Sequence, residues 1–335
     1  MSTGRTGRMT HTVTFGEAMI RLSPPGARRL EQAHALDVWV AGAELNLAVA
    51  LVRLGASASW VSCLPMNALG RKVDAHARGY GVDTNGVRWV DGGRVGLFFT
   101  EVGQAPRPSA TLYDRADSAF AAVEAQAFDW PALLHGAQAF HTSGITPALS
   151  PACARATADA LEAARRTDRH TSYDLNYRAM LTTPEEAWRC LESLAPAIDT
   201  VIASSTEIAT VCGLTGEPLD VAGRLRERLG VRRVVVSSRV DGRDGTQVRR
   251  SACADDDDEP CEVLSPGFRT VDPLGGGDAF AAGFLHGLLE AGPRRGLELG
   301  GVLAALKQSI PGDSAIVHRD EVEHLLNGGG VSTLR

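Results

Sequence analysis

The sequence has few cysteines and no long apolar run. Its six cysteines are scattered through 335 residues, and none belongs to a Cys-x-x-Cys pair. This scatter argues against a zinc site or a disulfide framework and favours reduced thiols. No apolar run approaches the roughly 20 residues of a membrane helix, and no apolar segment follows the basic N-terminus as in a secretory signal. We therefore expect a soluble, cytoplasmic protein without a membrane partner.

The sequence also has fewer basic than acidic residues. The 34 Lys and Arg residues are outnumbered by 40 Asp and Glu, for a net charge of −6. This balance argues against a nucleic-acid partner bound by broad phosphate neutralisation, although a local pocket can still bind one small anion. The chain contains no Gly-Lys dipeptide and no Gly-x-Gly-x-x-Gly. Walker and Rossmann nucleotide motifs are therefore excluded.

Short apolar runs alternate with helical stretches along most of the chain. Strands are predicted at 12–16, 58–63, 139–143, 171–174, 200–203 and 233–237. Helices are predicted at 42–54, 70–79, 151–167, 184–196 and 218–229. Nearly continuous apolar strands between helices are typical of an α/β fold with a parallel sheet covered on both faces.

Two segments, 18–40 and 93–117, do not follow this alternation of strands and helices. Both contain alternating apolar and polar residues, which predict a small β-sheet standing off the main domain. We expect one domain over 11–326, with disordered tails at 1–10 and 327–335. The open edges and apolar face of the small sheet predict a homo-oligomer joined partly through it.

Three consecutive glycines, Gly275, Gly276 and Gly277, precede Asp278 where a loop opens a helix. Glycines let the backbone approach a ligand closely, and a helix N-terminus adds unpaired N–H groups and partial positive charge. The combination suits an anion such as a phosphoryl group in transfer. Asp278 beside it can accept the proton of an attacking hydroxyl. From the loop alone, a plain turn with Asp278 as N-cap is an equal alternative.

A second motif lies far from this loop. The segment 41–48 reads Ala-Gly-Ala-Glu-Leu-Asn-Leu-Ala, and 272–280 reads Asp-Pro-Leu-Gly-Gly-Gly-Asp-Ala-Phe. Together they resemble the two signatures of the ribokinase-type (PfkB) carbohydrate kinases, and the resemblance extends over about 12–326. It implies a ribokinase-like three-layer α/β/α domain with a mainly parallel central sheet and a small β-sheet lid. It also implies ATP and Mg²⁺ as cofactors, Asp278 as general base and the glycine loop as anion hole.

Within the family, the sequence is most similar to 2-keto-3-deoxygluconate kinases. This likeness rests on the segments 16–19, 112–119, 143–150, 174–178 and 305–313. It implies transfer of the γ-phosphoryl group of ATP to the 6-hydroxyl of 2-keto-3-deoxygluconate or a closely related sugar acid. The residues implied at the sugar, besides Asp278, are Gly42, Asn46, Phe98, Tyr113, Arg115, Asn176 and Arg178.

An acidic sugar also has a physical argument in its favour. The planar fork of arginine matches a carboxylate, and Arg178 follows a predicted parallel strand at the end where α/β sheets bind ligands. Arg115 lies in the predicted lid beside Tyr113. A structural ion pair is the alternative for each arginine. Phe98 replaces a tyrosine that is common in these kinases, and buried Asn46 must bond either a ligand hydroxyl or a backbone carbonyl.

The residues implied at the nucleotide differ more from the family pattern than those implied at the sugar. Ser204 replaces a common asparagine, while Glu207 is retained as a partner of magnesium through water. Ser238 and Arg239 stand in place of the usual Lys/Thr-x-Gly turn, and Arg239 supplies positive charge for the phosphates. Lys307, in the segment 305–313, is expected at the nucleotide together with Gly275 and Gly277.

Three alternatives remain open from the sequence. The chain could phosphorylate another sugar of the fructose or ribose type. It could be a non-catalytic sugar- or nucleotide-binding relative, because two family positions are replaced by Ser204 and Ser238. A dehydrogenase is the third alternative, and against it stands the absence from this sequence of the dinucleotide-binding fingerprint Gly-x-Gly-x-x-Gly.

Overall fold

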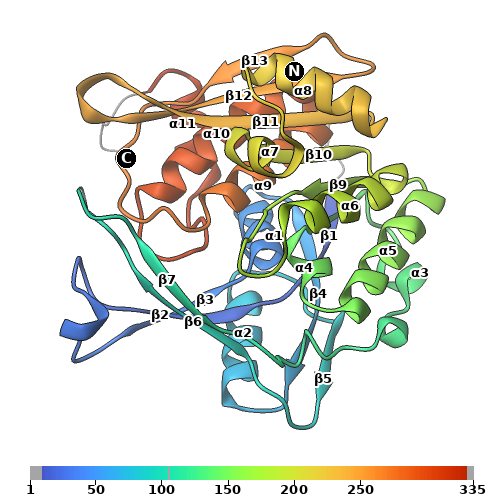
Figure 1. The fold of residues 1–335 in the computed structure, drawn as a ribbon, viewed down its shortest axis with the longest axis vertical. Coiled ribbons are helices and arrows are strands. Elements are labelled where there is room, and N and C mark those ends of the chain that lie inside the picture. The colour runs from blue at the N-terminus through green and yellow to red at the C-terminus, as the bar shows by residue number, and fades with distance from the viewer. Residues whose placement is uncertain (1–9, 105, 330–335) are drawn as a thin grey trace, which may run out of the picture.

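A computed structural model describes residues 10–104 and 106–329, so most of the two predicted tails lies outside the described residues. The chain forms a large nine-stranded sheet in the order β13-β12-β11-β10-β9-β8-β1-β4-β5 (Figure 1). All neighbours from β11 to β5 are parallel, whereas the β11–β12 and β12–β13 pairs are antiparallel. The strands are β1 His11–Phe15, β4 Ser57–Pro65, β5 Val87–Val90, β8 Ala139–Ser143, β9 His170–Asp174, β10 Thr200–Ser204, β11 Arg233–Asp241, β12 Gln247–Asp255 and β13 Cys261–Leu264.

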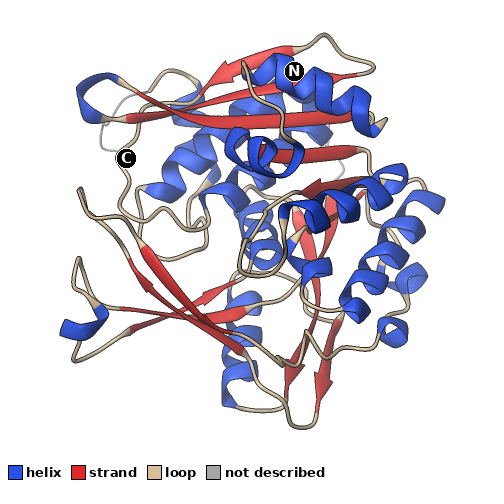
Figure 2. Ribbon diagram, in the orientation of Figure 1, coloured by secondary structure: helices blue, strands red, loops and turns tan. Residues whose placement is uncertain are grey.

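Helices cover both faces of this sheet (Figure 2). Along β11, Val234 and Val236 belong to one hydrophobic core and Val235 belongs to the other, as the period of two in a strand requires. The first core packs against α3 Trp130–Leu133, α5 Pro151–Arg166, α6 Pro184–Leu194, α7 Ser205–Cys212 and α8 Pro218–Leu229. The second packs against α1 Ala43–Arg53, α2 Ala68–Gly79, α9 Gly276–Ala291, α10 Pro293–Gln308 and α11 Arg319–Leu326. The predicted three-layer α/β/α architecture is confirmed.

Local signals account for where these helices begin and end. Ser150 caps α5 by accepting from the N–H of Cys153, and proline follows it at the first helical position. Gly213 and Gly230 adopt left-handed conformations at the C-terminal ends of α7 and α8. The remaining short helices are α4 Ile145–Ala148, η1 Leu30–Gln32, η2 Ala125–Ala127, η3 Ala195–Ala197 and η4 Arg243–Gly245. Among the described residues, none of the helices has the length and hydrophobicity needed to cross a bilayer.

The two segments predicted to leave the main domain form a separate four-stranded sheet, which we call the lid. Its order is β3-β2-β6-β7, and it extends away from the large sheet in Figure 1. Its strands are β2 Met19–Ser23, β3 Asp37–Ala41, β6 Gly96–Glu101 and β7 Ala110–Asp114. The parallel pairing of β2 with β6 joins the two segments.

Helices α9 and α10 approach each other closely through glycines. A Cβ atom on Gly283 would lie 2.7 Å from the Cα of Gly300, so neither position accepts a side chain without a shift of backbone. Because α9 begins at the glycine loop, this tight contact fixes the loop against α10 and the chain that follows it.

A buried ion cluster joins the lid to the glycine loop. Nη1 of Arg21, on β2, lies 2.8 Å from Oδ2 of Asp272 and 2.9 Å from Oδ2 of Asp313. Asp272 begins the glycine-loop segment, and Asp313 follows α10. Arg21 is only 1% exposed. Removing one member of such a cluster leaves the others charged and unpaired away from water.

We predict that Arg21→Met lowers the free energy of unfolding by about 3–5 kcal/mol, because two carboxylates lose their buried partner. Urea unfolding measures the change. Arg94→Met is the matched control, since Arg94 pairs with Asp114 on the lid surface and an exposed pair contributes about 1 kcal/mol or less. Equal losses in the two variants would contradict the prediction.

Candidate active site

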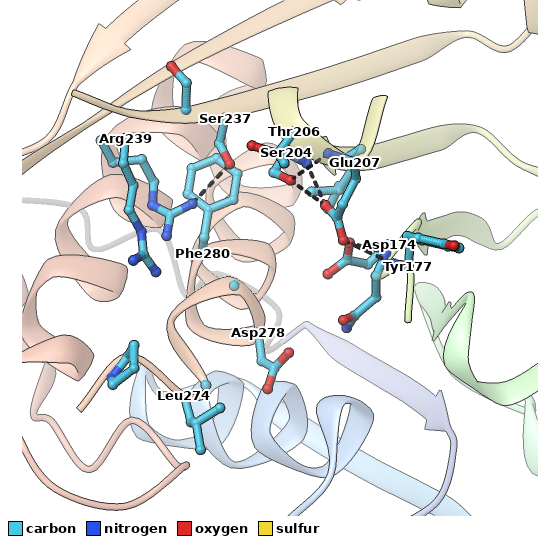
Figure 3. Close-up of a pocket in the computed structure, with 18 of the residues that line it drawn as sticks. Asp174, Tyr177, Ser204, Thr206, Glu207, Ser237, Arg239, Leu274, Asp278 and Phe280 are labelled. Carbon is cyan, nitrogen blue, oxygen red and sulfur yellow. Dashed lines mark hydrogen bonds between the residues drawn. The ribbon is translucent and has the colours of Figure 1, made fainter. Parts of the chain in front are cut away.

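A cavity of about 590 Å³ opens at the carboxyl ends of β9, β10 and β11, facing the start of α9. Parallel sheets bind ligands at this end. Figure 3 shows the cavity with Asp278 on the α9 side and Ser237 and Arg239 on the β11 side. The lining residues are Asp174, Asn176, Tyr177, Arg178, Ile202, Ala203, Ser204, Thr206, Glu207, Ser237, Ser238, Arg239, Arg249, Pro273, Leu274, Gly275, Gly277, Asp278 and Phe280.

The glycine loop needs its first glycine for two reasons. Gly275 has a φ of 73°, in the left-handed region, and a Cβ there would overlap the carbonyl oxygen of Asp313. It is also the N-cap of α9, and no side chain caps the helix. The alternative in which Asp278 is the N-cap is therefore wrong, and the first N–H groups of α9 remain free for an anion.

Asp278 is held by a side chain from the other signature segment. Its Oδ2 accepts from Nδ2 of Asn46 at 2.8 Å, and Oδ1 of Asn46 accepts from Ser314 at 3.1 Å. The buried amide of Asn46 thus has two side-chain partners rather than a backbone carbonyl. Burial raises the pKa of Asp278, while the Asn46 bond, Arg178 and Lys307 lower it.

Ser204 and Glu207 form a capping box at the start of α7. One carboxylate oxygen of Glu207 accepts from the N–H and hydroxyl of Ser204 at 2.8 and 2.7 Å. The other accepts from the N–H of Tyr177 at 3.0 Å. The serine that replaces the family asparagine is therefore a helix cap, and it fixes Glu207 between the ends of β9 and β10 (Figure 3).

A second carboxylate lies beside Glu207. Asp174 ends β9, and burial, followed by the charges of Glu207 and Asp278, raises its pKa well above the usual range. Its Oδ1 accepts from the N–H of Asn176, which adopts a left-handed φ of 39°. Within 10–104 and 106–329, no three His, Cys, Asp or Glu side chains are grouped closely enough to hold a metal ion. A magnesium ion here would be held through water and phosphate oxygens.

The two predicted arginines differ in their partners. Arg178 is exposed at the cavity, and no ion pair is recorded for it in the described part of the chain. Arg115 instead forms an ion pair with Glu17, which also accepts from Ser118. For Arg115, the structure therefore shows the alternative of a structural ion pair. Its Nε is buried and forms no hydrogen bond with any described residue.

The other lid and α1 residues lie outside this cavity. Phe98 is buried and stacks on Tyr113, with ring centroids 5.7 Å apart and planes 29° apart. Gly42 precedes α1, and a Cβ on it would lie 2.5 Å from the carbonyl oxygen of Glu17, so glycine is required there for packing. Asn46 links this part of the chain to the cavity through Asp278.

Lys307 lies beneath the glycine loop instead of at the cavity. Its side chain is fully buried, and its Nζ lies 3.3 Å from the carbonyl oxygen of Asp272 and 3.4 Å from that of Ile310. It acts on Asp278 through its charge. The structure thus gives it a supporting position, and the predicted nucleotide contact stays a prediction.

Sequence reasoning missed three polar residues here. Asp174 had a usable signal, since it ends a predicted strand two residues before Asn176. Glu44 also had a signal, since it is an acid within an apolar helix. Its Oε1 accepts from the N–H and hydroxyl of Ser143 at 3.0 and 2.6 Å. Burial raises the pKa of Glu44 to about 7. Arg249 had no signal, because its place depends on the register of the β11–β12 hairpin.

Comparison with known proteins identifies the family. The family model for pfkB family carbohydrate kinases matches residues 9–315. The chain belongs to this family. It is 42% identical over 322 residues to the 2-dehydro-3-deoxygalactonokinase of Haloferax volcanii, covering 95% of this chain and 96% of the relative.

Solved structures agree with the fold of this kinase. The 2-dehydro-3-deoxygluconokinase of Thermotoga maritima has a TM-score of 0.88 and 34% identity, covering 96% of this chain and 99% of its own. A putative ribokinase II from E. coli, solved with ATP and Mg²⁺, has a TM-score of 0.82 at 21% identity and covers 96% of this chain and 100% of its own. The predicted family, ribokinase-like fold and enzyme class are confirmed.

We predict that Asn46→Leu shifts the acid limb of the kcat–pH profile to higher pH. With Asp278 as the predicted general base, activity falls as the pH falls through its pKa, because only the ionised carboxylate accepts a proton, and loss of the Asn46 bond raises that pKa further. Ser314→Ala, which removes only the outer bond to Asn46, is expected to shift the limb less. An unmoved limb in Asn46→Leu would contradict the assignment of Asp278 as base.

Proposed function

We propose that this kinase transfers the γ-phosphoryl group of ATP to the 6-hydroxyl of 2-keto-3-deoxygluconate or a closely related sugar acid. The observation that carries the proposal is the position of Asp278, beside the free N–H groups of a three-glycine helix start and held by Asn46. The galactonate- and gluconate-specific names of the relatives support a sugar acid. These two acids differ in configuration at one carbon, so the proposal includes both.

Asp278 accepts the proton of the sugar hydroxyl as its oxygen attacks the γ-phosphorus. The N–H groups at the start of α9 stabilise the charge on the group in transfer. Glu207 and Asp174 face the cavity from the other side and would hold magnesium through water, and the ion would supply positive charge that neutralises the phosphates. ATP and Mg²⁺ are supported further by the ATP and Mg²⁺ bound in the E. coli relative.

The carboxylate of the sugar acid is assigned to Arg178. Its guanidinium lies on the same cavity as Asp278, on the loop after β9, and lacks a carboxylate partner among the described residues. A charged, bidentate contact of this kind is among the stronger ones that a protein makes. Fructose and ribose lack a carboxylate and would leave this arginine unpaired, which argues against the neutral sugars.

The lid closes the sugar side in this proposal and excludes water, which competes for the phosphoryl group. It also carries the predicted homo-oligomer contact. Leu112 and Val38 are 63% and 45% exposed on it, and β3 and β7 are its unpaired edges.

We predict that Asp278→Asn lowers kcat by about 10²–10⁴, because the variant has no general base. Coupled ATP turnover with 2-keto-3-deoxygluconate, 2-keto-3-deoxygalactonate, fructose and ribose measures both the loss and the preferred substrate. Asp168→Asn is the control, since Asp168 is an exposed residue with a left-handed φ of 57° that asparagine tolerates. Turnover near the wild-type value in Asp278→Asn would refute the mechanism, and no turnover of any sugar by the wild type would favour a non-catalytic relative.

We predict that Arg178→Met raises the KM for the sugar acid by more than about tenfold, because a charged hydrogen bond is lost. The KM for ATP should change by no more than about twofold. Arg189→Met, on the exposed surface of α6, is the control and should change neither. Equal increases in both KM values would show that Arg178 does not recognise the sugar carboxylate.

A further inference from the structure

Two arginines lie opposite each other across the β11–β12 hairpin. Arg239 and Arg249 are partners in the antiparallel register, and both side chains line the cavity. Like charges in directly opposite positions destabilise a sheet. In the described ranges, no ion pair with a carboxylate is recorded for either arginine. Their repulsion therefore goes uncompensated unless an anion binds between them.

Arg249 is the more unusual of the two, because it is only 6% exposed. Its Nη1 donates to the hydroxyl of Ser237 at 2.9 Å, which is the dashed line at Ser237 in Figure 3. Its Nε is buried and has no hydrogen-bond partner among residues 10–104 and 106–329. The guanidinium carbon lies 5.3 Å from the ring centroid of Phe280. A buried guanidinium with an unmade hydrogen bond destabilises the unliganded protein.

The next residue on β12 shows the contrast. Arg250 points to the other face of the hairpin, where it pairs with Glu217 and Glu262. Arg250 thus has two carboxylate partners, whereas Asp255, the carboxylate on the Arg249 face of β12, pairs with Arg233 at the far end of the strand. Burial first, and Arg239 second, lower the pKa of Arg249 to about 10, so it still carries its charge at neutral pH.

We propose that Arg249, together with Arg239, binds the phosphates of the nucleotide that are not transferred. The inference rests on the proposed function. Asp278, Asn46 and the glycine loop mark where the sugar hydroxyl meets the group in transfer, whereas Arg239 and Ser237 lie on the opposite, hairpin wall in Figure 3. The rest of the polyphosphate must extend toward that wall, and the fork of arginine matches phosphate oxygens.

The test is nucleotide binding without sugar, measured by calorimetry with MgADP. Arg249→Met is expected to raise the Kd about 10- to 100-fold, since a charged hydrogen bond is lost, and Arg249→Lys should recover part of the loss. Arg250→Met, the neighbour on the outer face, should change the Kd by no more than about twofold. In turnover, the KM for ATP should rise in Arg249→Met while kcat at saturating ATP stays within about threefold.

Thermal unfolding without nucleotide separates binding from a structural role. Arg249→Met should match or exceed the wild-type Tm, because it removes a buried unpaired charge, and it should lose most of the Tm increase that MgADP produces. Suppose that the wild type binds MgADP. A Tm of Arg249→Met below that of the wild type without nucleotide, or an unchanged Kd for MgADP in this variant, would then overturn the inference but not the proposed function. A wild type that binds no MgADP would overturn both the inference and the proposed function.

Discussion

The contact on which the site depends is the buried pairing of Arg21 with Asp272 and Asp313. It joins the lid, the start of the glycine-loop segment and the chain after α10, which are far apart in sequence. Burial raises the pKa of Asp313 to about 6 even though Arg21 opposes the shift. The cluster therefore adds little net stability, and its value lies in fixing three segments in one arrangement. Next to Asp313, Ser314 bonds Asn46, and Asn46 bonds Asp278, so the position of the base follows from the same cluster.

The charges around the base are arranged in two opposed groups. Asp174, Glu44 and Asp278 are all acids whose pKa values are raised by burial. The main cause is the same for all three, the desolvation of carboxylates that lie close together in the interior. Asp174 and Asp278 line the cavity together with Arg239 and Arg249. A cavity lined by acids and arginines is suited to a ligand that carries both phosphates and a magnesium ion.

The parts of the fold set by local patterns could be predicted from the sequence. The three valines at 234–236 place apolar side chains on both faces of a strand, which predicts a strand between two helical layers, and the three glycines before Asp278 predict the loop that opens α9. The parts that depend on distant partners could not. Arg115 pairs with Glu17 across 98 positions, and nothing in either segment indicates that pairing. The position of Lys307 beneath the glycine loop could not be predicted either. It depends on two backbone carbonyls, those of Asp272 and Ile310, and Asp272 is 35 residues away in sequence.

The pairing of Arg115 also bears on how the sugar acid is recognised. To bind a carboxylate of the sugar, Arg115 would have to release Glu17, which would keep a single side-chain hydrogen-bond donor, Ser118, among the described residues. That exchange of one carboxylate for another gains little free energy. Arg178 has no such partner to give up within the described residues, and it lies on the loop after β9 in the main domain rather than on the lid. We therefore expect recognition of the acid to belong to the main domain, and the lid to enclose a substrate that is already bound.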